Sequence, residues 1–232
     1  MAEAPAPAVR GHYHHGALRE AMIAAAEEVL AERGLGGFTL RECARRAGVS
    51  PAAPAHHFGN LTGLLTAIAT LGFIDLGTAM EAAVAAAQEQ GRSRLAAIAR
   101  AYVETALANP GRFRVVFGQR GIDREDVGCQ IASGRAFGIL LREVRLASGR
   151  PSLPASGQKP PADVLDPDLP EVLLAWAAVH GFSTLLIDGA LDFLNDKGSR
   201  EVFVDEYATR LFALLASALG ATQGLAKADA RD

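Results

Sequence analysis

Cysteine is scarce in this chain, which has only two among its 232 residues. Two cysteines cannot build a disulfide framework, and Cys43 and Cys129 lack the spacing of zinc ligands, so we expect both to be small core residues. No apolar run is long enough to span a membrane, and the Ala/Pro-rich first eleven residues lack the apolar core of a signal peptide. These absences predict a cytoplasmic protein with no membrane partner.

The motifs of the common enzyme classes are missing as well. The segment around Ser183 lacks the second glycine of a nucleophile elbow, and the chain has no His-Glu-x-x-His motif, phosphate loop or dinucleotide fingerprint. His12, His14 and His15 leave open a metal-dependent enzyme, but a free histidine cluster lacks the fixed geometry of a metal site. A flexible basic arm is the favoured interpretation. We therefore expect no enzyme, no cofactor and no metal.

Strand patterns are absent too, whereas half of the residues are apolar and alanine is abundant, which favours helix. The predicted fold class is therefore all-α. Apolar residues recur at helical spacing in segments 17–33, 40–47, 51–57, 61–89, 93–108, 110–118, 124–147, 169–194 and 199–219. Residues 148–168 are rich in turn formers and predict a loop, and both ends of the chain are expected to fray.

Residues 37–58 have the pattern of a short helix, a glycine turn and a second short helix. Thr39 and Glu42 form a capping-box pattern at the start of the first helix, and a glycine supplies the left-handed residue that ends it. Ser50 is placed to cap the second helix, with Pro51 at its first position. This pattern predicts a helix-turn-helix, whose second helix enters the DNA major groove, and the alternative is an ordinary helical hairpin.

The formal net charge of −3 does not show that the charges are unevenly distributed along the chain. Residues 1–65 hold six arginines, five of the six histidines and six acids, most of which lie on the first long helix. Because all three lysines come after residue 150, this region must bind phosphate or guanine through arginine, whose planar fork suits bidentate contacts. Two interpretations of Arg45 and Arg46 remain open: they contact phosphate, or they lie on a solvated helix face.

These segments resemble the TetR/AcrR family of transcriptional regulators. The matching residues are Ala25-Ala26, Glu32-Arg33-Gly34, Gly37-Phe38-Thr39-Leu40-Arg41, Ala47-Gly48-Val49-Ser50, His57-Phe58 and Leu64-Leu65. Further along, Trp176-Ala-Ala-Val-His180-Gly181 resembles the C-terminal domain signature of one branch, the Trp-x-x-x-His-Gly (WHG) type. The resemblance implies about nine helices: a three-helix DNA-binding head over 1–60, an effector-binding and dimerisation domain over 61–220, and a disordered tail over 221–232.

The resemblance also implies which residues of the head contact DNA. They are Thr39, Arg41, Ser50, Pro51, Ala52, Ala53, His56 and His57. Alanine and proline side chains cannot donate hydrogen bonds, so direct readout should be sparse and rest on apolar contacts such as a thymine methyl. The chain departs from the family pattern at Ala55, where tyrosine is usual, and at Leu61, where lysine is usual; both usual residues bind phosphate. Pro54 is expected to shorten the second helix.

Aromatic residues on the long helices predict a cavity for an effector. The candidate lining residues are Phe73, Tyr102, Phe117, Phe137, Trp176 and His180, although plain packing explains each aromatic residue equally well. Trp176 and His180 lie four residues apart and hence on one helix face. His180 is either a polar anchor for the effector or a core histidine that its neighbours satisfy.

The segment 173–191 is apolar almost all round, and a small helical protein cannot fully bury both it and the helix over 199–219. A homodimer closed through residues 169–219 is therefore expected, and the resemblance implies a four-helix interface; the alternative is a core pair within one chain. The resemblance further implies a ligand-responsive repressor that binds a palindromic double-stranded DNA operator and responds to an unknown small-molecule effector. The alternative function is a dimeric helical small-molecule binder whose degenerate head no longer reads DNA.

Overall fold

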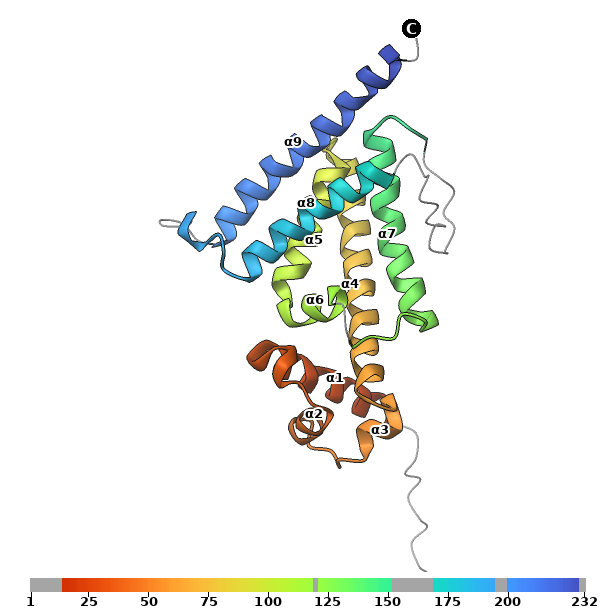
Figure 1. The fold of residues 1–232 in the computed structure, drawn as a ribbon, viewed down its shortest axis with the longest axis vertical. Helices are drawn as coiled ribbons and strands as arrows, with labels where there is room; N and C mark the ends of the chain where they lie inside the picture. Colours follow the sequence, from red (N-terminus) through yellow and green to blue (C-terminus); the bar gives the residue numbers. More distant parts are fainter. Residues whose placement is uncertain (1–13, 119–120, 152–168, 195–199, 230–232) are drawn as a thin grey trace, which may run out of the picture.

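The computed structural model describes residues 14–118, 121–151, 169–194 and 200–229, and every regular element in these ranges is a helix (Figure 1). The α-helices are α1 (His14–Arg33), α2 (Leu40–Arg46), α3 (Ala53–Phe58), α4 (Leu61–Glu89), α5 (Arg94–Ala108), α6 (Pro110–Phe117), α7 (Val127–Ala147), α8 (Leu169–Ile187) and α9 (Arg200–Asp229). Two short 3-10 turns, Leu35–Gly37 and Asp192–Leu194, follow α1 and α8. The all-α prediction with nine helices is confirmed for the part of the chain described.

The long helix α4 joins two parts of the molecule (Figure 1). Its first turns pack with α1 and α3 in a small head, and the rest of it packs with α5, α6 and α7 in a larger body. Helices α8 and α9 pack against α5. The two apolar cores divide in the same way, because Leu64 and Ile68 of α4 belong to the head core and Leu76 and Met80 belong to the body core.

The head forms around one apolar face of α1. Met22, Ala26 and Val29 recur at helical spacing and are fully buried, and they share a core with the apolar residues of α2 and the start of α4. Gly34 and Gly48 end α1 and α2 with φ angles of 60° and 67°, a left-handed conformation that glycine adopts without steric cost. The glycine turn of the predicted helix-turn-helix is therefore present.

Both cysteines are free and buried, as predicted. Cys43 of α2 lies in the head core, and Cys129 at the start of α7 packs against the same core. Burial raises the pKa of the Cys43 thiol to about 11. The thiol therefore stays protonated and unreactive at neutral pH, because the thiolate is the reactive form.

The second hairpin helix starts later than the capping pattern predicts. Helix α3 begins at Ala53, and its N-cap residue Ala52 offers no side-chain oxygen, so the prediction that Ser50 caps this helix with Pro51 at its first position is wrong. Pro54 is the physical reason. It has no N–H to donate to the Ser50 carbonyl, which accepts instead from the Ala53 N–H at 3.0 Å in a turn. Helix α3 is only six residues long, which confirms the predicted shortening.

Two helix ends in the body also differ from the predicted ranges. Helix α8 ends at Ile187 and not at residue 194. Gly189 takes a φ angle of 71°, and the Ala190 N–H bonds back to the Leu185 carbonyl at 2.9 Å, which closes the helix. Helix α9 continues to Asp229, into the segment predicted to be a tail, where alanine remains frequent and supports helix.

Two helices, α4 and α8, are long and apolar enough to cross a membrane by length and composition alone. In α4, half of the most apolar stretch is buried inside the protein, which is the behaviour of a core helix. In α8 a smaller share is buried, and Leu173, Leu174 and Leu185 are exposed. The fold of one chain, so far as it is described, therefore leaves an apolar face of α8 uncovered.

Candidate DNA-binding site and body cavity

Thr39 starts the first hairpin helix, α2, as the capping pattern predicts. Its Oγ1 accepts a hydrogen bond from the Glu42 N–H at 3.2 Å, which satisfies one of the free donors of the first turn. Among the described residues of the head, the Glu42 carboxylate accepts hydrogen bonds from arginine side chains and none from the Thr39 N–H. Only half of the predicted capping box therefore forms.

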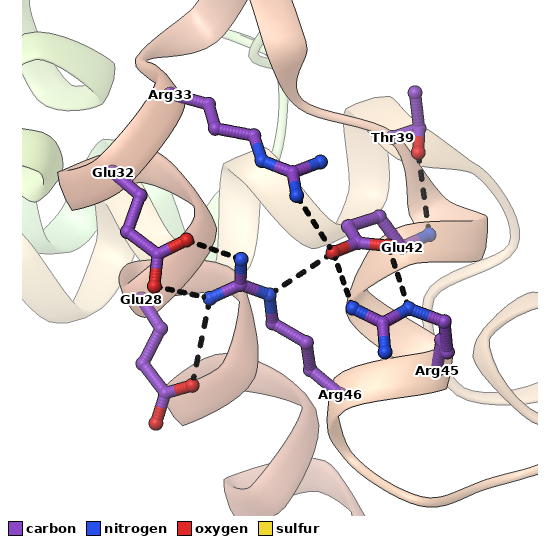
Figure 2. A network of polar contacts seen from close by, with 7 residues as sticks. All are labelled: Glu28, Glu32, Arg33, Thr39, Glu42, Arg45 and Arg46. Atoms are coloured by element: carbon purple, nitrogen blue, oxygen red, sulfur yellow. Dashed lines mark hydrogen bonds and ion pairs between the residues drawn. The ribbon is translucent and has the colours of Figure 1, made fainter.

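A cluster of acidic and basic side chains ties α2 to α1 (Figure 2). Glu42 accepts from Arg45 Nη2 at 2.7 Å and from Arg46 Nε at 3.1 Å, and its carboxylate lies 3.5 Å from Arg33 Nη2. Arg46 also reaches α1, where its Nη1 donates to Glu32 at 2.7 Å. Hydrogen bonds from Arg45 and Arg46 hold the pKa of the Glu42 carboxyl at about 2, so the carboxylate is ionised at physiological pH.

The cluster gives Arg46 a role that neither of the two interpretations of Arg45 and Arg46 included. The Arg46 side chain is only 14% exposed and is shared among Glu28, Glu32 and Glu42, so it holds the two helices together. Arg45 is exposed, but both of its hydrogen bonds go to the Glu42 carboxylate. Both arginine charges are therefore matched by acids inside the head.

Arg41 differs from the other arginines of α2. Its side chain is exposed and forms no ion pair with any residue that the structure describes. The predicted DNA contacts lie at the start of α2, in the turn and along α3: Thr39, Arg41, Ser50, Pro51, Ala52 and His56 are exposed, and Ala53 and His57 are half-buried. Arg41 is thus the arginine of α2 whose charge is available to a phosphate.

The basic arm predicted before α1 lies largely outside the described residues. Arg10 and His12 are outside them, and of His14 and His15 the structure describes only the backbone, in the first turn of α1. Arg19, further along α1, places its guanidinium 5.8 Å from the centroid of the Phe58 ring at the end of α3. This cation–π contact adds to the packing of α1 on α3.

The body contains a cavity of about 500 Å³. Its walls come from α4 to α9 and include all six residues that the sequence predicts to line a cavity: Phe73, Tyr102, Phe117, Phe137, Trp176 and His180. Most of the other lining residues are aliphatic, and Arg124 and Ser133 are polar exceptions. No described lining residue carries a carboxylate. The use of this cavity by an effector stays a prediction.

Phe117 lies at the centre of the aromatic part of the wall. Its ring centroid is 4.8 Å from that of His180, 5.8 Å from that of Tyr102 and 6.2 Å from that of Trp176. Phe113, one turn earlier on α6, stacks on His180 at 5.2 Å. Helix α6 and helix α8 therefore meet through the rings of Phe113, Phe117 and His180.

Tyr102 and His180 form the polar contact of this wall. The Tyr102 hydroxyl lies 2.9 Å from His180 Nδ1, so the histidine is satisfied at one ring nitrogen while it lines the cavity. Burial lowers the pKa of His180 and raises the pKa of the Tyr102 phenol. Both side chains are therefore uncharged at neutral pH.

Two polar lining residues, Arg124 and Ser133, are not singled out by the sequence. Arg124 lies just before α7, and Ser133 lies in its second turn. The start of α7 is marked in the sequence, because Asp126 caps it by accepting from the Cys129 N–H at 2.8 Å. Which face of α7 turns inward depends on its packing against α4, for which the sequence holds no local signal.

Helix α6 connects the cavity wall with the head. Phe117 lines the cavity, and Arg112 on the same helix donates from Nε to Glu27 Oε1 of α1 at 2.6 Å. Gly111 permits the close approach of the two helices, since a Cβ there would lie 2.9 Å from the Cβ of Leu30. Helix α6 therefore contacts both the cavity and α1 of the head.

Two family models match this arrangement of a head and a helical body. The one described as bacterial regulatory proteins, tetR family, matches residues 22–68, and the one described as tetracyclin repressor-like, C-terminal domain, matches residues 95–211. The chain belongs to the TetR family. In this TetR-family protein the helix-turn-helix is the DNA-binding unit, and the protein is a transcriptional regulator, a class that is not enzymatic. Its assignment to the WHG branch stays a prediction.

Solved structures share the TetR-family fold. A protein of unknown function from Rhodococcus sp. RHA1 is 32% identical, with a TM-score of 0.68 over 91% of this chain and 100% of that one. The putative regulatory protein SCO4313 is 18% identical, with a TM-score of 0.64 over 91% and 98% of the two chains. A tetR-family regulatory protein from Rhodococcus RHA1 is 24% identical, with a TM-score of 0.56 over 85% and 96%. No curated protein matches the sequence.

Proposed function

We propose that this TetR-family regulator is a ligand-responsive repressor, which binds a palindromic operator as a homodimer in the cytoplasm. The observation that carries the proposal is α6, which lines the body cavity through Phe117 and is bonded to α1 of the head through Arg112. We assign the head to residues 1–60 and the effector and dimerisation domain to 61–220. A ligand in the cavity then changes the position of the head.

The proposed DNA contacts divide into two kinds. Arg41, Thr39 and His57 bind phosphate or the rim of the groove, and they position the head without reading bases. The exposed turn before α3 and the exposed His56 face the major groove. Ser50 is the hydroxyl donor of this tip, while Pro51, Ala52 and Ala53 offer apolar contacts alone, which suits thymine methyl groups.

The proposed dimer interface is formed by α8 and α9. Exposed apolar side chains gather on these two helices: Leu173, Leu174, Leu185, Val202, Tyr207, Leu211 and Leu214. Tyr207, Leu211 and Leu214 are spaced by four and three residues and so share one face of α9. A second copy of the chain covers such a face by a two-fold axis, which places two heads on the same side of the DNA.

The proposed switch has two states. An effector that binds more tightly to the state in which the two heads do not fit the operator shifts the equilibrium toward that state. Operator DNA shifts the equilibrium back, and the coupling free energy is the same in both directions. Filling the cavity moves the aromatic wall of α6, and Arg112 carries this movement to α1. The mechanism therefore needs both the ring contacts at Phe117 and the ion pair with Glu27.

A gel shift with the DNA upstream of the chain's own gene tests the proposal against its rival, a dimeric small-molecule binder whose head no longer reads DNA. The proposal predicts a shifted band that survives excess random DNA, and the rival predicts none. Arg41→Ala should weaken the band and lower the salt slope by about 1 unit. Arg92→Ala, which removes another exposed arginine from the turn between α4 and α5, should leave the band unchanged.

A further inference from the structure

The hydrogen bond between Tyr102 and His180 has a direction. The phenol oxygen lies 2.9 Å from His180 Nδ1, and Tyr102 is buried. A buried phenol O–H needs a hydrogen-bond acceptor, and no described side chain other than His180 accepts it. The phenol therefore donates its proton to His180 Nδ1.

This direction determines the tautomer of the histidine. A neutral imidazole has one donor and one acceptor nitrogen. Because Nδ1 accepts the phenol proton of Tyr102, the ring proton must sit on Nε2. Nε2 forms no hydrogen bond with any described residue, while His180 lines the cavity. The hydrogen bond from Tyr102 to His180 therefore leaves an N–H donor at the cavity wall.

We infer that His180 Nε2–H is the specificity-determining donor of the cavity, and that its ligand is an apolar molecule with a carbonyl-type oxygen and no positive charge. This inference rests on the proposed use of the cavity as an effector site. A ligand without an acceptor leaves the donor buried and unpaired, which costs affinity. A cation finds no carboxylate among the described lining residues, whereas Arg124 is compatible with a neutral or anionic group.

The size and surface of the cavity agree with this class. A cavity of about 500 Å³ lies within the range of pockets that hold drug-sized ligands. Phe73, Phe117 and Phe137 offer ring surfaces to the body of the ligand. One polar donor among the rings of a mostly apolar wall fixes the orientation of the ligand without demanding several polar groups.

Matched probes test the inference on the full-length protein without DNA. Each set contains an aryl ketone, its methylene analogue and its ammonium analogue, such as benzophenone, diphenylmethane and diphenylmethylamine, with further sets built on 4-phenylbenzophenone and octanophenone. Dissociation constants come from the fluorescence of Trp176, the only tryptophan. The ketone of at least one set should bind about five- to tenfold more tightly than its methylene analogue, the gain expected from one neutral hydrogen bond. The ammonium analogue should bind most weakly.

Two variants separate the donor from the shape of the cavity. His180→Phe keeps a ring at this position but removes the donor, so the preference for the ketone should disappear while the hydrocarbon still binds. Tyr102→Phe removes the proton that selects the tautomer and should reduce the preference. Thr105→Val removes a hydroxyl from the same helix as Tyr102, one that bonds to the Ala101 carbonyl and does not line this cavity, and it should leave the preference unchanged. Nitrogen NMR of His180 should report a protonated Nε2 in the original chain.

The inference is overturned if no ketone binds better than its hydrocarbon, if His180→Phe keeps the preference, or if the NMR signal shows a proton on Nδ1. Operator release is measured separately. A ketone that binds with the expected preference but leaves DNA bound supports the inference and contradicts the proposed switch. A compound without an acceptor that releases DNA and survives His180→Phe supports the switch and contradicts the inference.

Discussion

Arg112 on α6 donates a hydrogen bond from Nε to Glu27 Oε1 on α1 at 2.6 Å. Each of the two side chains is only 20% exposed, and Arg112 also pairs with Asp75 on α4. A single guanidinium thus joins three helices where the head meets the body. Phe117, on the same helix, lines the cavity. Helix α6 therefore connects the cavity with the head.

Arg112→Ala should destabilise the protein by about 1–3 kcal/mol, because Glu27 loses a charge-assisted hydrogen bond at a partly buried site. Chemical denaturation measures the loss. The variant should also bind DNA while responding less to ligand. Arg114→Ala on the same helix is the matched control, since Arg114 pairs with Asp188 at the surface and should change stability by about 0.5 kcal/mol or less. Equal losses in the two variants would contradict the assigned role of Arg112.

Ala55→Tyr with Leu61→Lys should tighten DNA binding. Both positions are exposed, Ala55 on α3 and Leu61 at the first residue of α4, and phosphate donors there position the head on any sequence. Fluorescence anisotropy should show similar gains for operator and random DNA, with a salt slope steeper by about 1 unit from the lysine. If the double variant gains nothing, these positions do not face DNA, and the degenerate-head alternative becomes the better account.

Glu42→Gln should lower the stability of α2 at neutral pH and should make that stability less dependent on pH in the acid range. Arg45 and Arg46 hold the pKa of Glu42 at about 2, against an ordinary value of 4.5. A carboxyl whose pKa is lowered by folding stabilises the folded state above its ordinary pKa and loses that contribution as the pH falls from about 4.5 to about 2. Amide exchange protection in α2 measures the effect. Glu104→Gln, which removes a surface partner of Arg100 in α5, should leave α2 unchanged.

Leu214→Glu should convert the proposed dimer to monomers. The Leu214 side chain is 70% exposed on α9 in one chain, and a carboxylate buried there in a dimer would have no partner in the interface. Light scattering at micromolar concentration measures the mass. Val127→Glu places the same charge at a similarly exposed residue of α7 and should leave the mass unchanged. A monomeric original chain would remove the basis of the proposed interface.

Local signals predicted much of the fold. Thr39 caps α2 and Gly48 ends it, because capping and left-handed turns depend on a few neighbouring residues. The start of α3 was mispredicted, because Pro54 overrides the capping signal of Ser50. The end of α8 was missed because its apolar pattern continues past Gly189.

The sequence predicted which residues belong to the candidate site but not which of them contact one another. Spacing placed Trp176 and His180 on one helix face, but the hydrogen bond of His180 with Tyr102 joins residues 78 positions apart. The matching of Arg46 by Glu32 depends in the same way on how α2 crosses α1. Such contacts follow from tertiary packing, which no local pattern contains.

Selection of bound sequences from random DNA tests the central claim most directly, because it asks whether this head reads DNA and in what symmetry. The account predicts enrichment of a palindrome whose half-sites lie about 10 base pairs apart or a multiple of that, with A·T-rich contacts under the apolar tip of α3. The same selection with Arg41→Ala should return the same palindrome at lower yield. No enrichment, or an asymmetric single site, would contradict the account.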